Sequence, residues 1–220
     1  MQDKNSKVWF FKDLDIYAGV SEKALCTLAP DSFEENYRQG TQIYTPDQTD
    51  QNIYVLKHGE VILYHSKDGK RAIFDTLGPG SVFGNFDSNQ PNPTHYAETT
   101  KGTLLCVTPL PEFLNIIKNR PELMLNLMQR MAERIQDYET KIKSNIETAS
   151  ERVYMELERL QKKRQGSIMG KILPIPLQIT HEKLAEYTNL NRVTVTRSIK
   201  QLKDEGLIRI SENGSIELIG

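Results

Sequence analysis

Two arginines near the carboxyl end of the chain, Arg192 and Arg197, have the side chains best suited to sequence-specific chemistry. They stand five positions apart in a stretch without Gly or Pro, which is typical of a helix. An arginine offers paired N–H donors that match O6 and N7 of guanine, while Thr and Lys side chains reach phosphate oxygens. The candidate DNA-binding residues are Arg192, Val193, Thr194, Thr196, Arg197, Lys200 and Thr180. The alternative interpretation is a small helical subdomain whose arginines are only solvated.

The residues before this stretch predict the two helices that would position it. Thr180 is a suitable N-cap for a first helix over residues 181–188. Asn189 suits the left-handed residue of the turn that follows, because asparagine tolerates that conformation. Asn191 is expected to cap the second helix by accepting a hydrogen bond from a free backbone N–H. The sequence therefore predicts a helix-turn-helix unit.

A hairpin is predicted after the second helix. Gly206 is placed to end that helix, and Asn213–Gly214 favours a tight type I′ turn between two short strands. Helix, turn, helix and hairpin in this order are the plan of a winged helix-turn-helix. Such a unit places its second helix in the major groove of DNA.

The amino-terminal part has a different character. Residues 36–108 alternate short runs rich in Val, Ile, Tyr and Thr with turn dipeptides such as Asp68–Gly69 and Pro79–Gly80. Several short strands at this spacing predict a small sandwich or barrel. A helix at about residues 21–30 is expected before the first strand.

A heptad pattern lies between the two parts. No Gly or Pro occurs from 122 to 146, and the apolar residues are spaced alternately four and three apart. This period favours a narrow seam against a partner helix, and hence a homodimer, although packing against the chain's own domain is the alternative. The expected dimer-interface residues are Met124, Met128, Met131, Ile135, Tyr138 and Ile142. The predicted domains are a sensor domain (1–120), a dimerisation helix (121–148) and a DNA-binding domain (149–220).

Charge and composition support this division and exclude other classes. Residues 1–148 carry 16 basic and 20 acidic side chains, whereas residues 149–220 carry 12 basic and 9 acidic ones, which is a weak indication of a polyanionic partner. No apolar run approaches the roughly 18 residues of a membrane span, and no secretion signal is recognisable. Cys26 and Cys106 cannot build a disulfide framework. We expect a cytoplasmic protein.

No enzymatic motif is recognisable. A nucleophile elbow, a phosphate-binding P-loop, an HExxH pair and a Cys-x-x-Cys pair are all missing from the sequence. The four histidines are scattered without a His-x-His pair, which disfavours a haem site or a metal-dependent β-helix enzyme. We therefore expect no catalytic residues, no metal and no cofactor. A thiol sensor at Cys26 stays open, while Cys106 lies in an apolar run and is interpreted as a core residue.

The whole pattern resembles the cyclic-AMP receptor protein / FNR (Crp/Fnr) family over about residues 20–219. The carrying segments are NIYVLKHGEVILYHSKDGKRAIFDTLGPGSVFG and ITHEKLAEYTNLNRVTVTRSIKQLKDEGLI, in this order and joined by the heptad helix. The resemblance implies an α+β fold with a double-stranded β-helix, similar to a cyclic-nucleotide-binding jelly roll, and a winged helix-turn-helix. It also implies a homodimeric transcriptional regulator, commonly an activator, that binds two-fold symmetric double-stranded DNA and contacts RNA polymerase.

The resemblance extends to individual residues of the recognition helix. Arg192 and Arg197 match the two arginines with which these regulators contact DNA. Val193 departs from the glutamate of many members, and a valine offers apolar contact to a thymine methyl instead of accepting from cytosine. The string RVTVTR is most similar to the nitrogen-control regulator NtcA. We therefore expect a GTA half-site rather than the TGTGA type.

The effector of the family, cyclic AMP, is not expected to bind. The segment Gly78–Gly84 occupies the phosphate-binding cassette, but Asn85 replaces the glutamate that holds the ribose, and no Arg or Lys lies between 72 and 100. An unpaired phosphate in a half-buried pocket is unfavourable. On the long helix, Tyr138 and Glu139 replace the pair that meets adenine. The candidate effector-pocket residues are Phe83, Gly84, Asn85, Arg134, Tyr138 and Glu139.

The sequence leaves open whether an effector other than cyclic AMP controls the protein. In NtcA the long helix supplies an arginine and a glutamate to 2-oxoglutarate, and Arg134 and Glu139 have that spacing. The second pocket arginine aligns with Asn92 and is absent, which weakens dicarboxylate binding. Alternatively, Arg134 and Glu139 form an ordinary interhelical ion pair beside the seam. An unknown effector, no effector, or a β-helix protein that binds a small molecule or metal and no DNA are the remaining alternatives.

Overall fold

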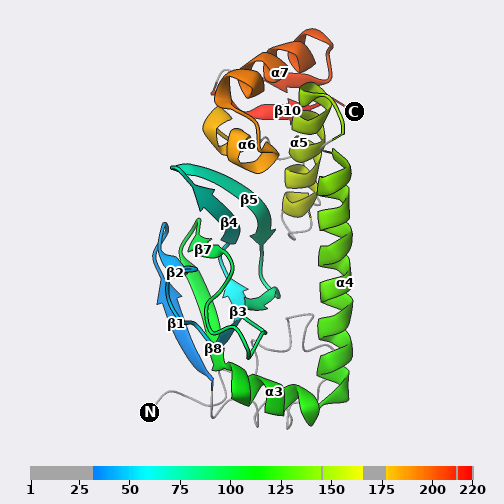
Figure 1. The fold of residues 1–220 in the computed structure, drawn as a ribbon. Helices are drawn as coiled ribbons and strands as arrows, with labels where there is room; N and C mark the ends of the chain where they lie inside the picture. The colour runs from blue at the N-terminus through cyan, green and yellow to red at the C-terminus, as the bar shows by residue number, and fades with distance from the viewer. Residues whose placement is uncertain (1–31, 145, 166–176, 212, 220) are drawn as a thin grey trace. The chain divides into compact units, whose positions relative to one another are not determined.

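The computed structural model describes residues 32–144, 146–165, 177–211 and 213–219. They form two compact units (Figure 1). The first unit holds most of the amino-terminal strands and the long helix α4 as far as Gln136, and the second holds the chain from Asp137 onward with Lys67–Ile73. Among the described helices, none combines the length and the apolar character that a membrane crossing requires. The helix predicted at residues 21–30, and Cys26 with it, lies outside the described residues.

Two four-stranded antiparallel sheets form the frame of the first unit, in the orders β1-β8-β3-β6 and β2-β7-β4-β5. Apart from the consecutive strands β4 and β5, strands adjacent in a sheet are distant in sequence, so crossover connections join the two sheets. This arrangement confirms the predicted double-sheet domain. The strands are β1 (Phe33–Tyr37), β2 (Gln42–Tyr44), β3 (Asn52–His58), β4 (Val61–Lys67), β5 (Lys70–Leu77), β6 (Val82–Gly84), β7 (Tyr96–Thr99) and β8 (Thr103–Pro109).

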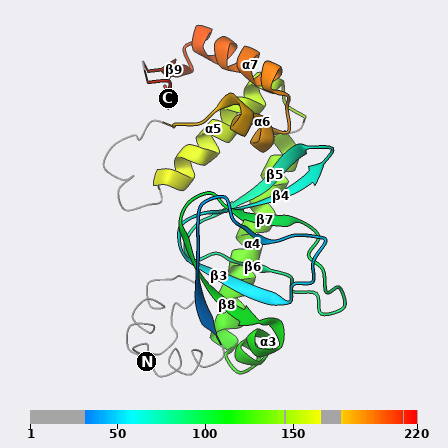
Figure 2. The same ribbon diagram turned by 90° about the vertical axis from the view of Figure 1, so that its left-hand side faces the viewer.

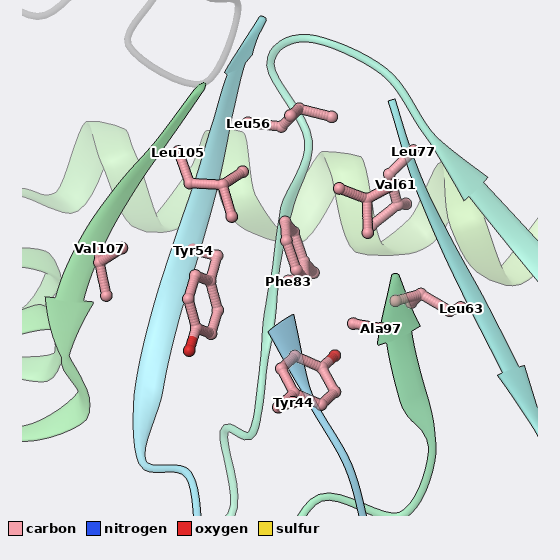
Figure 3. Close-up of a cluster of buried hydrophobic side chains, with 10 residues drawn as sticks. All are labelled: Tyr44, Tyr54, Leu56, Val61, Leu63, Leu77, Phe83, Ala97, Leu105 and Val107. Carbon is pink, nitrogen blue, oxygen red and sulfur yellow. The ribbon is translucent and has the colours of Figure 1, made fainter. Parts of the chain in front are cut away.

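The central strand β3 is buried on both faces. Tyr54 and Leu56 point to the core between the sheets, whereas the alternate residues Ile53 and Val55 pack on the other side. Tyr54 stacks on Phe83 with ring centroids 5.2 Å apart. Figure 3 shows this inner cluster, which consists of Tyr44, Tyr54, Leu56, Val61, Leu63, Leu77, Phe83, Ala97, Leu105 and Val107.

Helices α3 (Leu110–Lys118) and α4 (Pro121–Ser144) cover the outer side of β3 and β8. Phe113 and Leu127 pack there against Val55 and Cys106. Burial raises the pKa of the Cys106 thiol, because the thiolate would lose its hydration. This environment confirms the interpretation of Cys106 as a core residue.

The heptad stripe of α4 divides between two faces. Met131, a residue of the predicted dimer seam, packs instead against the hydrophobic core of its own unit and is partly buried there. Tyr138 is also half-buried. Four residues of the stripe remain exposed, and Leu125 beside them is 66% exposed although the sequence stripe did not include it. The exposed four are Met124, Met128, Ile135 and Ile142.

In the described part of the second unit, further helices and a small hairpin follow the end of α4 (Figure 2). The core of this unit consists of Val153, Leu157, Leu177, Leu184, Val195, Ile199, Leu202, Ile208 and Ile216. Helix α5 contacts both α6 and α7, and Leu177 forms a bridge to Ile216 beside the hairpin. The elements are α5 (Ala149–Gln165), α6 (His181–Thr188), α7 (Arg192–Asp204), β9 (Ile208–Ile210) and β10 (Ile216–Leu218).

The helix-turn-helix connection follows the predicted local chemistry. The Thr180 hydroxyl accepts the Lys183 N–H over 3.1 Å, and Asn191 Oδ1 accepts the Thr194 N–H over 2.8 Å. Asn189 adopts the left-handed conformation with φ 53° and ψ 37°. These capping predictions are confirmed.

The turn of the hairpin differs from the predicted type I′. A two-residue type I′ loop at Asn213–Gly214 would pair the residues on either side of it, but the Ser211 N–H donates to Ser215 O over 3.0 Å, so the loop is longer. Five residues separate the strands, and the Gly214 N–H donates to Ser211 O over 2.9 Å. Asn213 Oδ1 accepts from the Ser215 N–H over 3.1 Å, an Asx-type contact within this loop. The predicted hairpin is therefore correct, and its predicted turn type is wrong.

Candidate nucleic-acid interface

Helix α7 separates its side chains into a buried and an exposed face. Val195, Ser198, Ile199 and Leu202 are buried against the second unit. At 3.6 residues per turn, most of the predicted DNA-binding residues fall on the opposite face. The exposed set is Arg192, Val193, Thr196, Arg197 and Lys200, while Thr194 is half-buried. The face offers two guanidinium groups and an ammonium group to a polyanion.

Val193 is 59% exposed on this face, although it is a large apolar side chain. It stands between Arg192 and Thr194 in the first turn of the helix, the turn that reaches base edges when such a helix enters the major groove. An exposed apolar group at this position fits contact with a thymine methyl.

The amino-terminal end of α6 contacts this face at two points that the sequence reasoning missed. Glu182 Oε1 lies 2.6 Å from Arg192 Nε. His181 Nδ1 lies 2.9 Å from Thr196 Oγ1, which also donates to Arg192 O over 2.9 Å. In a helix-turn-helix the first residues of the two helices are neighbours. This general geometry could have predicted both contacts from the sequence. Thr180 is exposed beside them, with its hydroxyl oxygen engaged in the α6 cap.

The candidate effector residues of the first unit are largely committed to the fold. Phe83 is 1% exposed within the inner core. Gly84 has a φ of +128°, and a Cβ there would lie 2.3 Å from Asn52 O, so only glycine fits. The Asn85 amide group donates to Gln90 O, and its oxygen accepts from the Asp87 N–H over 3.1 Å. This loop binds its own backbone.

Arg134 is paired inside its own unit. Its Nε donates to Asp75 Oδ2 over 3.0 Å, and Nη1 donates to Val82 O over 3.1 Å. Asp75 is 4% exposed and also accepts the Thr76 N–H over 2.7 Å. Glu139 is exposed and forms no ion pair with Arg134 within the described chain. Tyr138 and Glu139 lie beyond Gln136, in the second unit.

A histidine occupies the same region of the first unit. His95 Nε2 lies 2.9 Å from the Tyr44 hydroxyl, and its ring contacts Phe74 edge-on at 5.1 Å. The pKa of His95 is lowered to about 4, chiefly by burial and then by the neighbouring His65 and Arg134, while Asp75 acts in the opposite direction. The imidazole is therefore neutral at physiological pH. No group of three or more candidate metal-ligating side chains is clustered among the described residues.

Comparison with protein families matches both units of the chain. The cyclic nucleotide-binding domain model matches residues 34–120, and the Crp-like helix-turn-helix domain model matches residues 151–219. The chain is 24% identical over 198 residues to a CRP-like cAMP-activated global transcriptional regulator of Mycobacterium tuberculosis, covering 89% of this chain and 88% of the relative. It is 26% identical over 185 residues to the cyclic AMP receptor protein of Thermus thermophilus, covering 83% and 82%.

Solved structures show the same fold. The c-di-GMP responsive global regulator CLP of Xanthomonas campestris superposes with a TM-score of 0.75 at 17% identity, covering 88% of this chain and 96% of that chain. CooA of Carboxydothermus hydrogenoformans superposes with a TM-score of 0.65 at 18% identity, covering 87% and 85%. The two matching domain models, the two curated relatives and the exposed basic face of α7 lead to one conclusion: the chain is a DNA-binding transcriptional regulator of the Crp/Fnr type.

Proposed function

We propose that the chain acts as a homodimer that reads a two-fold symmetric DNA site without cyclic AMP. The observation that carries this proposal is the exposed face of α7, where Arg192 and Arg197 stand opposite a buried apolar face. Two such helices related by a two-fold axis enter successive major grooves when they are about 34 Å apart. Further contacts to bases or phosphates around these arginines come from Thr194, Thr196, Lys200 and Thr180.

The exposed apolar residues of α4 support the dimer. Ile135 is 55% exposed and Ile142 is 68% exposed, seven positions apart on one face of the helix. Large apolar side chains at heptad spacing stabilise a helix pair when they are buried against an equivalent helix. Met124 and Met128 extend the same face toward the start of α4. Met131 and Tyr138 lie at its edge.

The proposed half-site is GTA, as in the nitrogen-control regulator NtcA. Val193 supports it because an exposed valine cannot accept a hydrogen bond from cytosine N4. Val193 therefore favours contact with a thymine over contact with the cytosine that a glutamate at this position would bind. The dimer would occupy GTA–N8–TAC, and by analogy with the family it would act in the cytoplasm as an activator that contacts RNA polymerase.

Independence of cyclic AMP is proposed from the Asp75–Arg134 pair. The sequence has no Arg or Lys between 72 and 100, and the Arg134 guanidinium is already paired with a buried carboxylate. A cyclic phosphate would have to displace Asp75, whose charge would then be buried beside another anion. The same contact opposes 2-oxoglutarate, which would need Arg134 as a carboxylate partner.

Fluorescence anisotropy with a labelled GTA–N8–TAC duplex tests this proposal. We expect the purified protein alone to bind it more tightly than a matched duplex with TGTGA half-sites, at one fixed salt concentration. Cyclic AMP or 2-oxoglutarate should leave the affinity unchanged. Binding that depends on either ligand would contradict effector independence, and preference for TGTGA would contradict the half-site. Equal binding to every duplex would contradict sequence-specific reading altogether.

A further inference from the structure

The ion pair between Arg192 and Glu182 joins the first turns of the two helices of the helix-turn-helix. Arg192 is the first residue of α7, and Glu182 is the second residue of α6. Their side chains approach to 2.6 Å although both are largely exposed, at 68% and 59%. Exposed pairs contribute little to folding stability, so stability does not account for this contact.

The atom that Glu182 engages is what makes the contact informative. The carboxylate makes its closest approach to Nε, on the side of the guanidinium, rather than to the two terminal Nη groups. A guanidinium that reads guanine end-on uses those terminal groups to meet O6 and N7. Engagement of Nε thus leaves the reading edge available and removes rotamers that would turn it away. A preorganised side chain loses less entropy when it binds.

We propose that Glu182 is a positioning residue that sets base specificity by orienting Arg192 for end-on contact with guanine. This inference rests on the proposed function, because it needs α7 to enter the major groove. The proposal gives an acidic side chain a role in recognising the DNA sequence. A carboxylate at this place would otherwise only weaken binding to a polyanion. Water is displaced when the groove closes on the helix, so the pair becomes stronger in the complex than in the free protein.

The acidic charge of Glu182 also has a predictable effect on non-specific binding. A carboxylate near phosphates weakens sequence-independent affinity, which is dominated by electrostatics. Removing it should therefore strengthen binding to random DNA while it weakens discrimination between bases. A positioning role predicts that non-specific affinity rises while base discrimination falls, whereas a simple effect of charge would change the affinity alone.

The test compares Glu182→Gln with Glu186→Gln in the full-length protein. Glu186 lies one turn further along α6 and pairs with Lys183 at 3.1 Å and with Arg71 at 3.9 Å. Its substitution removes the same charge, and among the described residues Glu186 forms no ion pair with α7. The probe is the tightest duplex that the parent selects from a randomised pool. Single-base variants of that duplex identify the guanine whose preference Arg192→Ala removes. We expect Glu182→Gln to reduce the preference for this guanine roughly fivefold, the lower end of what a bidentate contact provides.

Four further measurements complete the test. Glu186→Gln should keep the preference at that guanine, and Glu182→Gln should leave the preferences at other positions unchanged. In an Arg192→Ala background, Glu182→Gln should have no additional effect on specificity. Circular dichroism melting should show that the variants fold as the parent does.

Each contrary outcome has a distinct meaning. A parent that selects no sequence from the pool overturns the proposed function, and this inference with it. A parent that selects a sequence, but whose Glu182→Gln variant keeps the guanine preference, overturns the positioning role alone. Tighter binding of Glu182→Gln to all duplexes with unchanged discrimination would show that Glu182 only repels DNA, which also overturns it.

Discussion

The guanidinium of Arg134 donates to the carboxylate of Asp75 over 3.0 Å and so ties α4 to β5 within the first unit. The Asp75 side chain is 6% exposed, whereas that of Arg134 is 22% exposed. Arg134 also donates to Val82 O, so the arginine connects the helix to two strands. The pair places a protein carboxylate where Arg134 would otherwise be available to an anionic effector.

Asp75→Ala should destabilise the first unit by about 3 kcal/mol, because it leaves the Arg134 charge largely buried without its partner. Urea denaturation followed by circular dichroism measures the free energy of unfolding. The matched control is Glu133→Ala, which breaks the exposed Arg130–Glu133 pair and should change stability by less than about 1 kcal/mol. Equal effects of the two variants would contradict a structural role for the buried pair.

The stability of the protein should fall as the pH is lowered from 6.5 toward about 4, partly through His95. Burial, with the neighbouring His65 and Arg134, lowers the pKa of this imidazole from 6.5 to about 4. Between these values the unfolded chain binds a proton that the folded chain does not, so acid favours unfolding. Thermal melting as a function of pH should show a smaller decline for His95→Gln than for the parent. Identical pH profiles would show that His95 does not carry this dependence.

Ile135→Asp should weaken dimerisation at least about tenfold, because a charge would be buried against the partner helix. Ile135 is 55% exposed in the single chain, so the folded protomer should tolerate the change. Sedimentation equilibrium measures the dimer dissociation constant. Gln129→Asp is the control, since it adds the same charge at an exposed position of α4 outside the apolar stripe. Dimerisation that survives Ile135→Asp would place the dimer interface elsewhere.

Arg197→Ala should abolish sequence-specific DNA binding, because the variant loses a guanidinium that offers paired donors to guanine. Arg38→Ala removes the same charge from an exposed position in the first unit and should leave DNA binding unchanged. Anisotropy titrations with specific and random duplexes measure both effects. If the Arg197 variant binds the specific duplex as the parent does, α7 does not read that site.

The local features of the second unit were predictable because they depend on neighbours in sequence. Thr180 and Asn191 cap their helices through backbone groups three residues away, and Asn189 adopts its left-handed conformation within one turn. The same reasoning failed at the hairpin, where Asn213 makes contacts with Ser211 and Ser215 that a dipeptide rule does not include. The short runs rich in Val, Ile, Tyr and Thr between turn dipeptides likewise predicted the strands of a sandwich or barrel, since both signals are local in sequence.

Contacts between distant segments were decided only by the tertiary structure. Arg134 pairs with Asp75, 59 positions away, because the fold brings α4 against β5, and no spacing along the sequence had indicated this pair. Met131 fits the heptad period but packs on its own core, since a period specifies a helix face and not which surface covers it. Glu182 meets Arg192 because the turn at Asn189 brings two helix starts together. Sequence thus determined the elements and the chemistry they carry, whereas packing decided which charged and apolar groups meet.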